Sequence, residues 1–148
     1  MTDDHSRLDA TALAELVRTR EVTPLELVDA AIGRIERLDG NINAVIHRRF
    51  DQARAEAQSD RLSDGPFRGV PITLKDLWPS SVGDPFHQGV QALKDAGHTS
   101  TVDSDLVKLY RAAGFIVIGR TNTPELGLSA TTEPAAHGPT RNPWNLNF

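Results

Sequence analysis

The chain has 148 residues, of which 39% are hydrophobic and 24% charged, so it has the composition of one soluble globular domain rather than of a disordered segment. Its formal net charge of -4 and the lack of a basic tract argue against a nucleic-acid partner, because phosphates are met by clustered lysines and arginines. The absence of cysteine excludes a disulfide framework and a cysteine nucleophile within these residues, and it fits a reducing cytoplasm. The polar N-terminus does not resemble a signal peptide, and the longest apolar run, Phe115 to Ile118, is far shorter than the about 20 residues that span a bilayer. We therefore expect a cytoplasmic protein without a membrane partner.

Two helices are predicted at the start of the chain. Asp9 is a good N-cap for the first, in which leucine and valine recur on one face. The second has a stronger start signal: Thr23 supplies a capping hydroxyl, Pro24 takes the first helical position, and Glu26 completes a capping box. Gly40 is the expected end of this second helix.

The middle of the chain predicts two strands separated by a helix. Residues Asn43 to Ile46 are expected to form a short strand, and Asp51 to Arg61, which is rich in helix-forming residues, a third helix. The compact apolar run Val70 to Leu74 is expected to form a second strand with Lys75 at its end. Residues 79–101 have weak periodicity and predict a long loop, which in a small domain is usually functional or disordered.

A helix followed by glycine and a buried strand is expected next. The helix begins at Asp103 or Ser104 and runs through Ala113, Gly114 ends it, and Phe115 to Ile118 form the strand. Three side chains are expected on its inward face: Leu106, Leu109 and Tyr110. This order is typical of an α/β unit and favours a largely parallel sheet. The predicted fold class is α/β, with N-terminal helices followed by part of a mixed, helix-covered sheet. Beyond it, residues 123–125 are expected to start a short helix, and residues 131–148 have no periodic pattern.

Lys75 is the residue that most suggests chemistry, because it stands within an apolar run. Its neighbours Leu74, Leu77 and Trp78 are expected to desolvate the ammonium group, and desolvation lowers the pKa of a lysine. A neutral lysine is one known base for activating a serine hydroxyl. The alternative is a strand-end lysine that points to solvent, which is the commoner situation for this residue type.

Three blocks of sequence resemble the amidase-signature enzymes. The segment Gly69 to Leu77, GVPITLKDL, is similar to the lysine motif of that family, and Ala112 to Leu126, AAGFIVIGRTNTPEL, to its helix, glycine and strand ending in a Thr-Asn motif. The segment Gly138 to Leu146, GPTRNPWNL, resembles the lead into the Gly/Ser-rich signature, and Thr23 to Leu27 also fits the family pattern. The form of the third block, Thr131 to Asn145, looks closest to members that act on cyclic or linear amides of small amino acids.

The resemblance implies amide hydrolysis by a lysine, a serine in a cis peptide and a serine nucleophile, with Lys75 as the general base. Both serines are expected in a segment after Leu146, so residues 1–148 are expected to be the N-terminal part of a single amidase domain, incomplete at the C-terminus and inactive alone. Asn122 resembles a position near the family's substrate cleft, although an asparagine that bonds its own turn is an equal alternative. The resemblance implies a small-molecule amide substrate, no cofactor and a possible homo-oligomer.

The remaining polar residues favour structural roles. None of the serines lies in a Gly-x-Ser-x-Gly context, which disfavours them as nucleophiles: Ser80, Ser81, Ser100, Ser104 and Ser129. No metal site is predicted, because no metal-ligand spacing relates the histidines: His5, His47, His87, His98 and His137. Asp103 and Asp105 are expected to cap the start of the helix rather than to form an acid–base pair. Asp76 is expected to point to the other face of the strand from Lys75. A nucleotide-binding module is disfavoured because no Gly-rich phosphate motif occurs, whereas a non-catalytic remnant or interaction domain of α/β type stays open.

Overall fold

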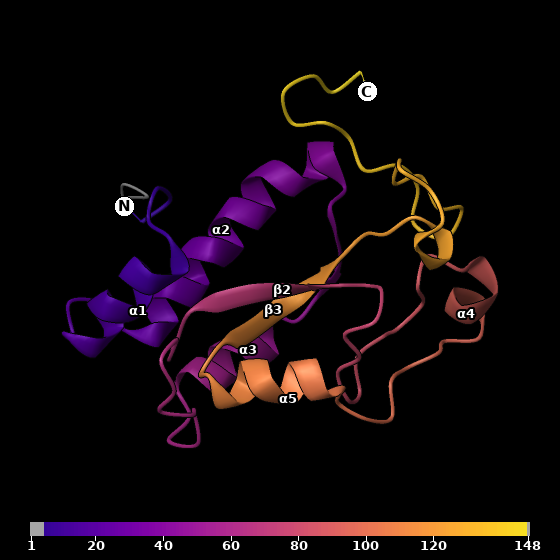
Figure 1. Cartoon of the computed structure of the whole chain (residues 1–148). Coiled ribbons are helices and arrows are strands. Elements are labelled where there is room, and N and C mark those ends of the chain that lie inside the picture. Colours follow the sequence, from indigo (N-terminus) through magenta and orange to yellow (C-terminus); the bar gives the residue numbers. More distant parts are fainter. Residues whose placement is uncertain (1–4, 148) are drawn as a thin grey trace.

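The computed structural model describes residues 5–147, which form a three-stranded sheet with helices on both faces (Figure 1). In chain order the elements are α1 (Ala10–Arg18), α2 (Pro24–Ile42), β1 (Val45–Arg48), α3 (Phe50–Ala57), β2 (Pro71–Lys75), α4 (Gln91–Asp95), α5 (Asp105–Ala112), β3 (Ile116–Thr121) and the 3-10 turn η1 (Glu125–Gly127). No helix in the described part of the chain is both long and apolar enough to cross a membrane.

The starts of the two N-terminal helices are confirmed. The Asp9 carboxylate accepts a hydrogen bond from the amide of Ala12 at 2.8 Å. At α2, the Thr23 hydroxyl accepts from the amide of Glu26, and the Glu26 carboxylate accepts from the amide of Thr23 at 2.7 Å. The reciprocal bonds satisfy amides that the first turn of a helix otherwise leaves without partners.

The predicted end of α2 at Gly40 is wrong. The helix continues to Ile42, and Asn43 ends it in the left-handed conformation with a φ of 58°. Asparagine tolerates this conformation better than other non-glycine residues. The Asp39 carboxylate then accepts from the amides of Ala44 and Val45, so side chains at the end of the helix, rather than a glycine, direct the chain into β1.

The sheet has the order β1-β3-β2, with β3 in the centre. Strands β2 and β3 run parallel, as the helix, glycine and strand order predicts, whereas β1 pairs with β3 antiparallel. The sheet is therefore mixed. The predicted strands are confirmed as elements with shifted bounds, since β1 begins at Val45 and β3 continues to Thr121.

Alternate side chains of β3 enter two separate cores, because successive residues of a strand point to opposite faces. Ile116 and Ile118 pack with Val28 and Ile32 of α2 and with α3 on one face. On the other face, Val117 packs with Leu74 of β2 and Val107 of α5. Figure 1 shows α2 and α5 on opposite sides of the strands. The full burial of Ile116 and Val117 shows that β3 is covered on both sides.

The inward face predicted for α5 is wrong at two positions. Leu106 and Leu109 are 45% and 67% exposed, whereas Val107 is fully buried and Tyr110 packs against it. The spacing of Val107 and Tyr110 places both on one side of the helix. The Ser104 hydroxyl caps the helix by accepting from the amide of Val107, which confirms the start signal. Both leucines therefore lie on the surface of the described chain.

Two other elements differ from the predicted bounds. α3 ends at Ala57, with Gln58 as its C-cap, and does not reach the expected end at Arg61. The loop expected over residues 79–101 is largely confirmed, but it contains the short helix α4. That helix has five residues and buries none of them, so its sequence carries no apolar period that would reveal it. The short helix expected from residues 123–125 is the 3-10 turn η1.

We predict that the 148-residue chain self-associates. The exposed α5 leucines and the edge strands leave apolar and hydrogen-bonding surface that favours intermolecular contact. Circular dichroism is expected to show helix, the thermal transition to be broad or absent, and gel filtration to give a species larger than a monomer. A sharp cooperative transition from a monodisperse monomer would contradict this expectation and would mean that the chain is a domain in its own right.

Candidate functional site

Lys75 is the last residue of β2, where its backbone is held by the neighbouring strand. It is paired with Thr121 of β3, and the next amide, that of Asp76, donates to the Thr121 carbonyl at 2.9 Å. The Lys75 carbonyl accepts from Nη2 of Arg120 at 3.2 Å. The position of Lys75 is therefore set by backbone bonds, whereas its side chain is free to reach outward.

The predicted desolvation of Lys75 is not seen. Its side chain is exposed, and Trp78, which was expected to cover it, is itself 77% exposed. The reason is that the chain turns away directly after the strand, with Trp78 at a φ of 67°. The apolar flank of the motif thus lies beside Lys75 in sequence without enclosing its ammonium group.

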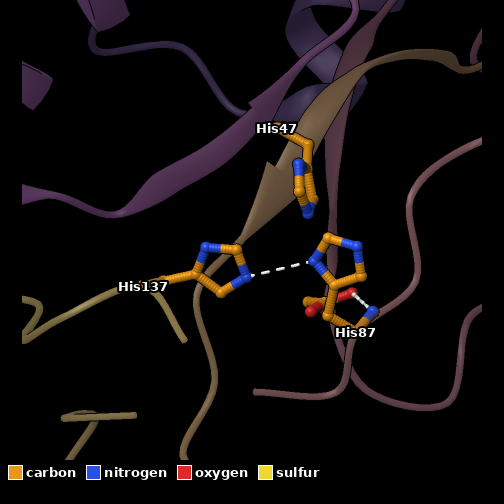
Figure 2. A group of neighbouring side chains, drawn as sticks. His47, His87 and His137 are labelled. Atoms are coloured by element: carbon orange, nitrogen blue, oxygen red, sulfur yellow. Dashed lines mark hydrogen bonds between the residues drawn. The ribbon is translucent and has the colours of Figure 1, made fainter. Parts of the chain in front are cut away.

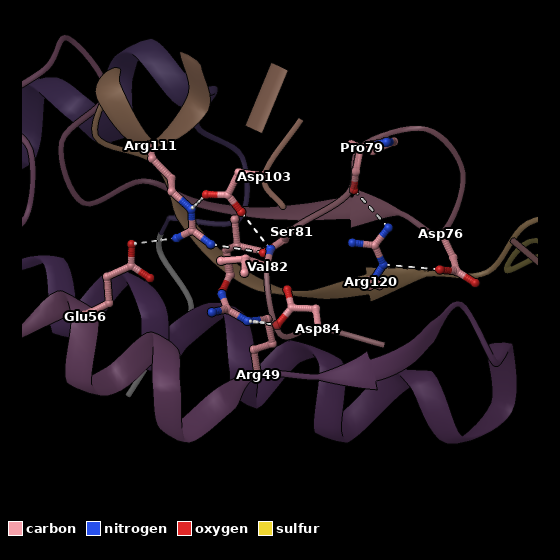
Figure 3. A network of polar contacts seen from close by, with 11 residues as sticks. Arg49, Glu56, Asp76, Pro79, Ser81, Val82, Asp84, Asp103, Arg111 and Arg120 are labelled. Carbon is pink, nitrogen blue, oxygen red and sulfur yellow. Dashed lines mark hydrogen bonds and ion pairs between the residues drawn. The ribbon is translucent and has the colours of Figure 1, made fainter. Parts of the chain in front are cut away.

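Asp76 and Arg120 form a fully buried ion pair next to Lys75 (Figure 3). Nε of Arg120 donates to Oδ1 of Asp76 at 3.2 Å, and Nη2 donates to the Pro79 carbonyl at 2.9 Å as well as to that of Lys75. The guanidinium also lies 5.0 Å from the ring centre of Phe86. Because Asp76 faces the interior with Arg120, it does not pair with Lys75, as its position in the strand predicts.

Two further arginines form ion pairs that connect the loop after β2 to the helices (Figure 3). Arg49 pairs with Asp84 at 2.8 Å. Arg111 of α5 reaches Asp103 at 3.2 Å, the Ser81 hydroxyl at 3.0 Å and Glu56 of α3 at 3.4 Å. The loop that sequence patterns leave undefined is thereby ordered by ion pairs between distant segments.

Asn122 is buried, and its side-chain amide forms hydrogen bonds with neighbouring parts of the chain. Its Nδ2 donates to the Gly138 carbonyl and to the Thr140 hydroxyl, both at 3.0 Å, and its Oδ1 accepts from the amide of Thr123. These bonds hold residues 138–140 against the end of β3. They fit the alternative of a structural asparagine, and a substrate contact by Asn122 stays a prediction.

Three of the five histidines meet beside Asp76, although their spacing in the sequence does not indicate a metal site (Figure 2). His47 lies in β1, His87 in the loop before α4, and His137 in the C-terminal segment. One ligand atom from each histidine and from Asp76 all lie within 4.8 Å of one another. Burial lowers the pKa of both His47 and His137 to about 4 and also lowers the pKa of His87. The three imidazoles are thus neutral near pH 7, in the state that binds metals.

The predicted structural roles of several other polar residues are supported by their contacts. Ser104 is the N-cap of α5, and the Ser81 hydroxyl accepts from Arg111. Asp105 pairs with Lys108 on the surface of α5, and Asp103 accepts from the amide of Val82 as well as pairing with Arg111. These residues stabilise the helix start and the loop rather than converging on Lys75.

The model of the amidase family matches residues 26–148. The chain belongs to the amidase family. The matched span contains β2 with Lys75, the whole sheet and the C-terminal segment, so the family assignment rests on most of the described fold.

Characterised relatives match nearly the whole chain. The 6-aminohexanoate-cyclic-dimer hydrolase of Paenarthrobacter ureafaciens is 48% identical over 138 residues, which cover 93% of this chain and 27% of the relative. The lipoamidase of Enterococcus faecalis is 41% identical over 146 residues, covering 97% of this chain and 20% of the relative. A solved structure of 6-aminohexanoate cyclic dimer hydrolase complexed with substrate superposes with a TM-score of 0.88 at 47% identity, covering 94% of this chain and 28% of that one. The chain thus spans about a quarter of the length of these hydrolases.

We predict that the buried Arg120 holds the loop after β2 in place. Replacing Arg120 with methionine leaves the Asp76 charge buried without its partner, a change that typically costs about 3–5 kcal/mol. Since each 1.4 kcal/mol is about tenfold, tryptic cleavage after Lys94 is expected to be accelerated about 100-fold or more when it follows opening of the loop. The comparison is made in residues 1–148 joined to the remaining part of the Paenarthrobacter ureafaciens hydrolase, so that it does not depend on the stability of the isolated chain. Gel electrophoresis of timed samples measures this rate.

The matched control is Arg54→Met. Arg54 forms an ion pair of the same kind with Asp29, at 2.8 Å, but both side chains are 40% or more exposed. Exposed pairs contribute about 0–1 kcal/mol, so this variant should be cleaved after Lys94 at nearly the parent rate. Equal cleavage of the parent and Arg120→Met would contradict the anchoring role.

Proposed function

We propose that this chain supplies the general base of an amide hydrolase, with Lys75 acting through a serine in a cis peptide on a serine nucleophile. On this proposal residues 1–148 are the N-terminal part of a single amidase domain, and the two serines belong to a part of such a domain that these residues do not include. The observation that carries the proposal is the match to the amidase family across residues 26–148, within which the GVPITLKDL motif positions Lys75 at the end of β2.

The geometry around Lys75 supports a role in proton transfer. Its backbone is fixed by β3 and by the buried Arg120, whereas its side chain is exposed and has no ion pair within residues 5–147. The neighbouring carboxylate that would otherwise pair with the lysine is already held by Arg120. An amine in this situation is available to a partner brought to it by other parts of an amidase domain.

The proposed reaction is acyl transfer in two steps. The amine of Lys75 takes a proton from the bridging serine, which takes one from the nucleophilic serine as its oxygen attacks the amide carbonyl. The carbon–nitrogen bond breaks, the leaving amine receives the proton, and an ester to the serine remains. Water then attacks the ester and gives a proton to the same lysine, and that proton returns through the bridging serine to the nucleophilic serine as its bond to the acyl carbon breaks and the acid is released.

A cyclic or linear amide of a small amino acid is the substrate class that we propose. The relatives that support it are the 6-aminohexanoate-cyclic-dimer hydrolases, which are 47% and 48% identical to this chain. The lipoamidase is less similar, at 41%. The higher identity favours the cyclic-dimer hydrolases, and the sequence of the segment Thr131 to Asn145 resembles family members that act on amides of small amino acids.

The isolated chain is expected to hydrolyse no amide, because the serines of the proposed mechanism are missing from it. Purified chain is incubated with the 6-aminohexanoate cyclic dimer and with simple aliphatic and aromatic amides, and released primary amine or ammonia is measured. Turnover above background that disappears in Lys75→Ala would show that a nucleophile lies within these residues and would overturn the proposal.

A chimera tests Lys75 directly. Residues 1–148 are joined to the remaining part of the Paenarthrobacter ureafaciens hydrolase, and Lys75→Ala is introduced. We expect kcat on the cyclic dimer to fall about 10²- to 10⁴-fold, the usual contribution of a positioned general base, while KM and circular dichroism change little.

The control for this experiment is Lys108→Ala. Lys108 is an exposed lysine that pairs with Asp105 on the surface of α5, so its loss should leave kcat unchanged. If Lys75→Ala retains the kcat of the parent chimera, Lys75 is a structural lysine and the proposed mechanism is wrong.

A further inference from the structure

The histidine cluster beside Asp76 brings four potential ligands together from four segments of the chain. His47 comes from β1, Asp76 from the end of β2, His87 from the following loop, and His137 from the C-terminal segment. The ring centres of the histidines are 4.8, 5.3 and 5.4 Å apart. Figure 2 shows the three rings converging on one point, with a nitrogen of His47 directed between the other two rings.

Two of the ligand atoms are buried without a hydrogen-bond partner in the described part of the chain. They are Nε2 of His47 and Oδ2 of Asp76. A buried polar atom without a partner is destabilising, so native proteins rarely leave such atoms unsatisfied. Oδ1 of Asp76 is occupied by Arg120 and by the amide of His87, which fixes the carboxylate with Oδ2 left over.

The remaining two ligand atoms already have the separation that a tetrahedral metal requires. Nδ1 of His87 and Nε2 of His137 lie 3.3 Å apart. Zinc–nitrogen bonds of about 2.0–2.1 Å at tetrahedral angles place two nitrogens about 3.3–3.4 Å apart. The other ligand atoms lie within 4.8 Å, so small rotations of the side chains would complete the set.

The charges around the cluster restrict the kind of metal. Arg120 is neutralised by Asp76, and Arg49 by Asp84, whereas the Lys94 ammonium donates to the Ala136 carbonyl near His137 and remains positive. A cation would therefore gain little from the surrounding field and would depend on its ligand bonds. Calcium and magnesium prefer an all-oxygen environment, whereas three imidazoles and one carboxylate suit zinc and its neighbours in the first transition row.

We propose that His47, His87, His137 and Asp76 bind one divalent transition-metal ion, with zinc as the expected metal. A four-coordinate ion in this place would join β1, the loop after β2 and the C-terminal segment. Such a joint is structural, because all four ligand positions are filled by protein. The proposal does not depend on amide hydrolysis, and its test measures metal binding alone.

Equilibrium dialysis against zinc, with the dissolved metal buffered by a chelator, tests the proposal on the 148-residue chain. Dialysis measures uptake whatever the association state of the chain. We expect one zinc per chain and binding at least about 100-fold weaker in His137→Phe, since even the loss of a group behind a ligand costs about 10- to 100-fold. Phenylalanine keeps a flat ring against His87 and removes only the nitrogens.

Two companions make the result specific. His98→Ala removes an exposed histidine from the same loop outside the cluster and should leave zinc binding unchanged. Cobalt in place of zinc should give the intense visible absorption of a four-coordinate site in the parent chain and in His98→Ala, but not in His137→Phe or His47→Phe. Circular dichroism without metal verifies that these variants match the parent.

Three outcomes would overturn the proposal. The first is a parent chain that takes up no zinc, including one that is only partly folded without metal, because metal binding to a real site draws its ligands together as it folds. The second is equal binding by the parent and His137→Phe. The third is an equal loss of binding in His98→Ala. Any of these outcomes would mean that no metal ion joins the three histidines.

Discussion

Asp76 and Arg120 are both fully buried, and each is tolerable in the interior only because the other is there. Arg120 lies in the central strand, and its Nη2 donates to the carbonyls of Lys75 and Pro79, on either side of the turn that follows β2. One guanidinium thus fixes the end of the strand that carries Lys75 and the start of the long loop. Asp76, held by Arg120, lies beside three histidines and keeps its second oxygen without a hydrogen-bond partner in the described part of the chain. The proposed base and the proposed metal site therefore depend on the same ion pair.

The local structure of this chain follows from short-range signals, and the departures have identifiable causes. Thr23, Pro24 and Glu26 predict the start of α2 because a capping box acts within one turn. The end of α2 could not be predicted in the same way, since it depends on Asn43, whose side chain donates to the carbonyls of His137 and Pro139 far along the sequence. The inward face of α5 could not be predicted from the sequence, because the apolar residues Leu106, Val107 and Leu109 point in different directions around the helix. Contact with Val117 of β3 buries Val107 and so determines which face is inward.

The candidate site was predictable only in part. The motif around Lys75 gives its place at the end of a parallel strand, but its exposure depends on the backbone at Trp78, where a non-glycine residue adopts a positive φ that the sequence does not reveal. In the sequence, Arg120 looks like an ordinary charged residue at the end of a strand. In the structure it lies opposite Leu74 and forms an ion pair with Asp76. The histidines are separated by 40 and 50 positions, so only the sheet order and the path of the C-terminal segment bring them together.

Lys75 is proposed to act as a base and not merely to complete a strand end. Chemical rescue separates the two possibilities: the hydrolysis rate of the Lys75→Ala chimera is measured as methylamine is added. We expect a rate that is nearly lost without amine and that rises in proportion to the concentration of neutral methylamine, because a small amine can take the place of the missing side chain as proton acceptor. A variant that hydrolyses the amide at the parent rate, with or without methylamine, would contradict it.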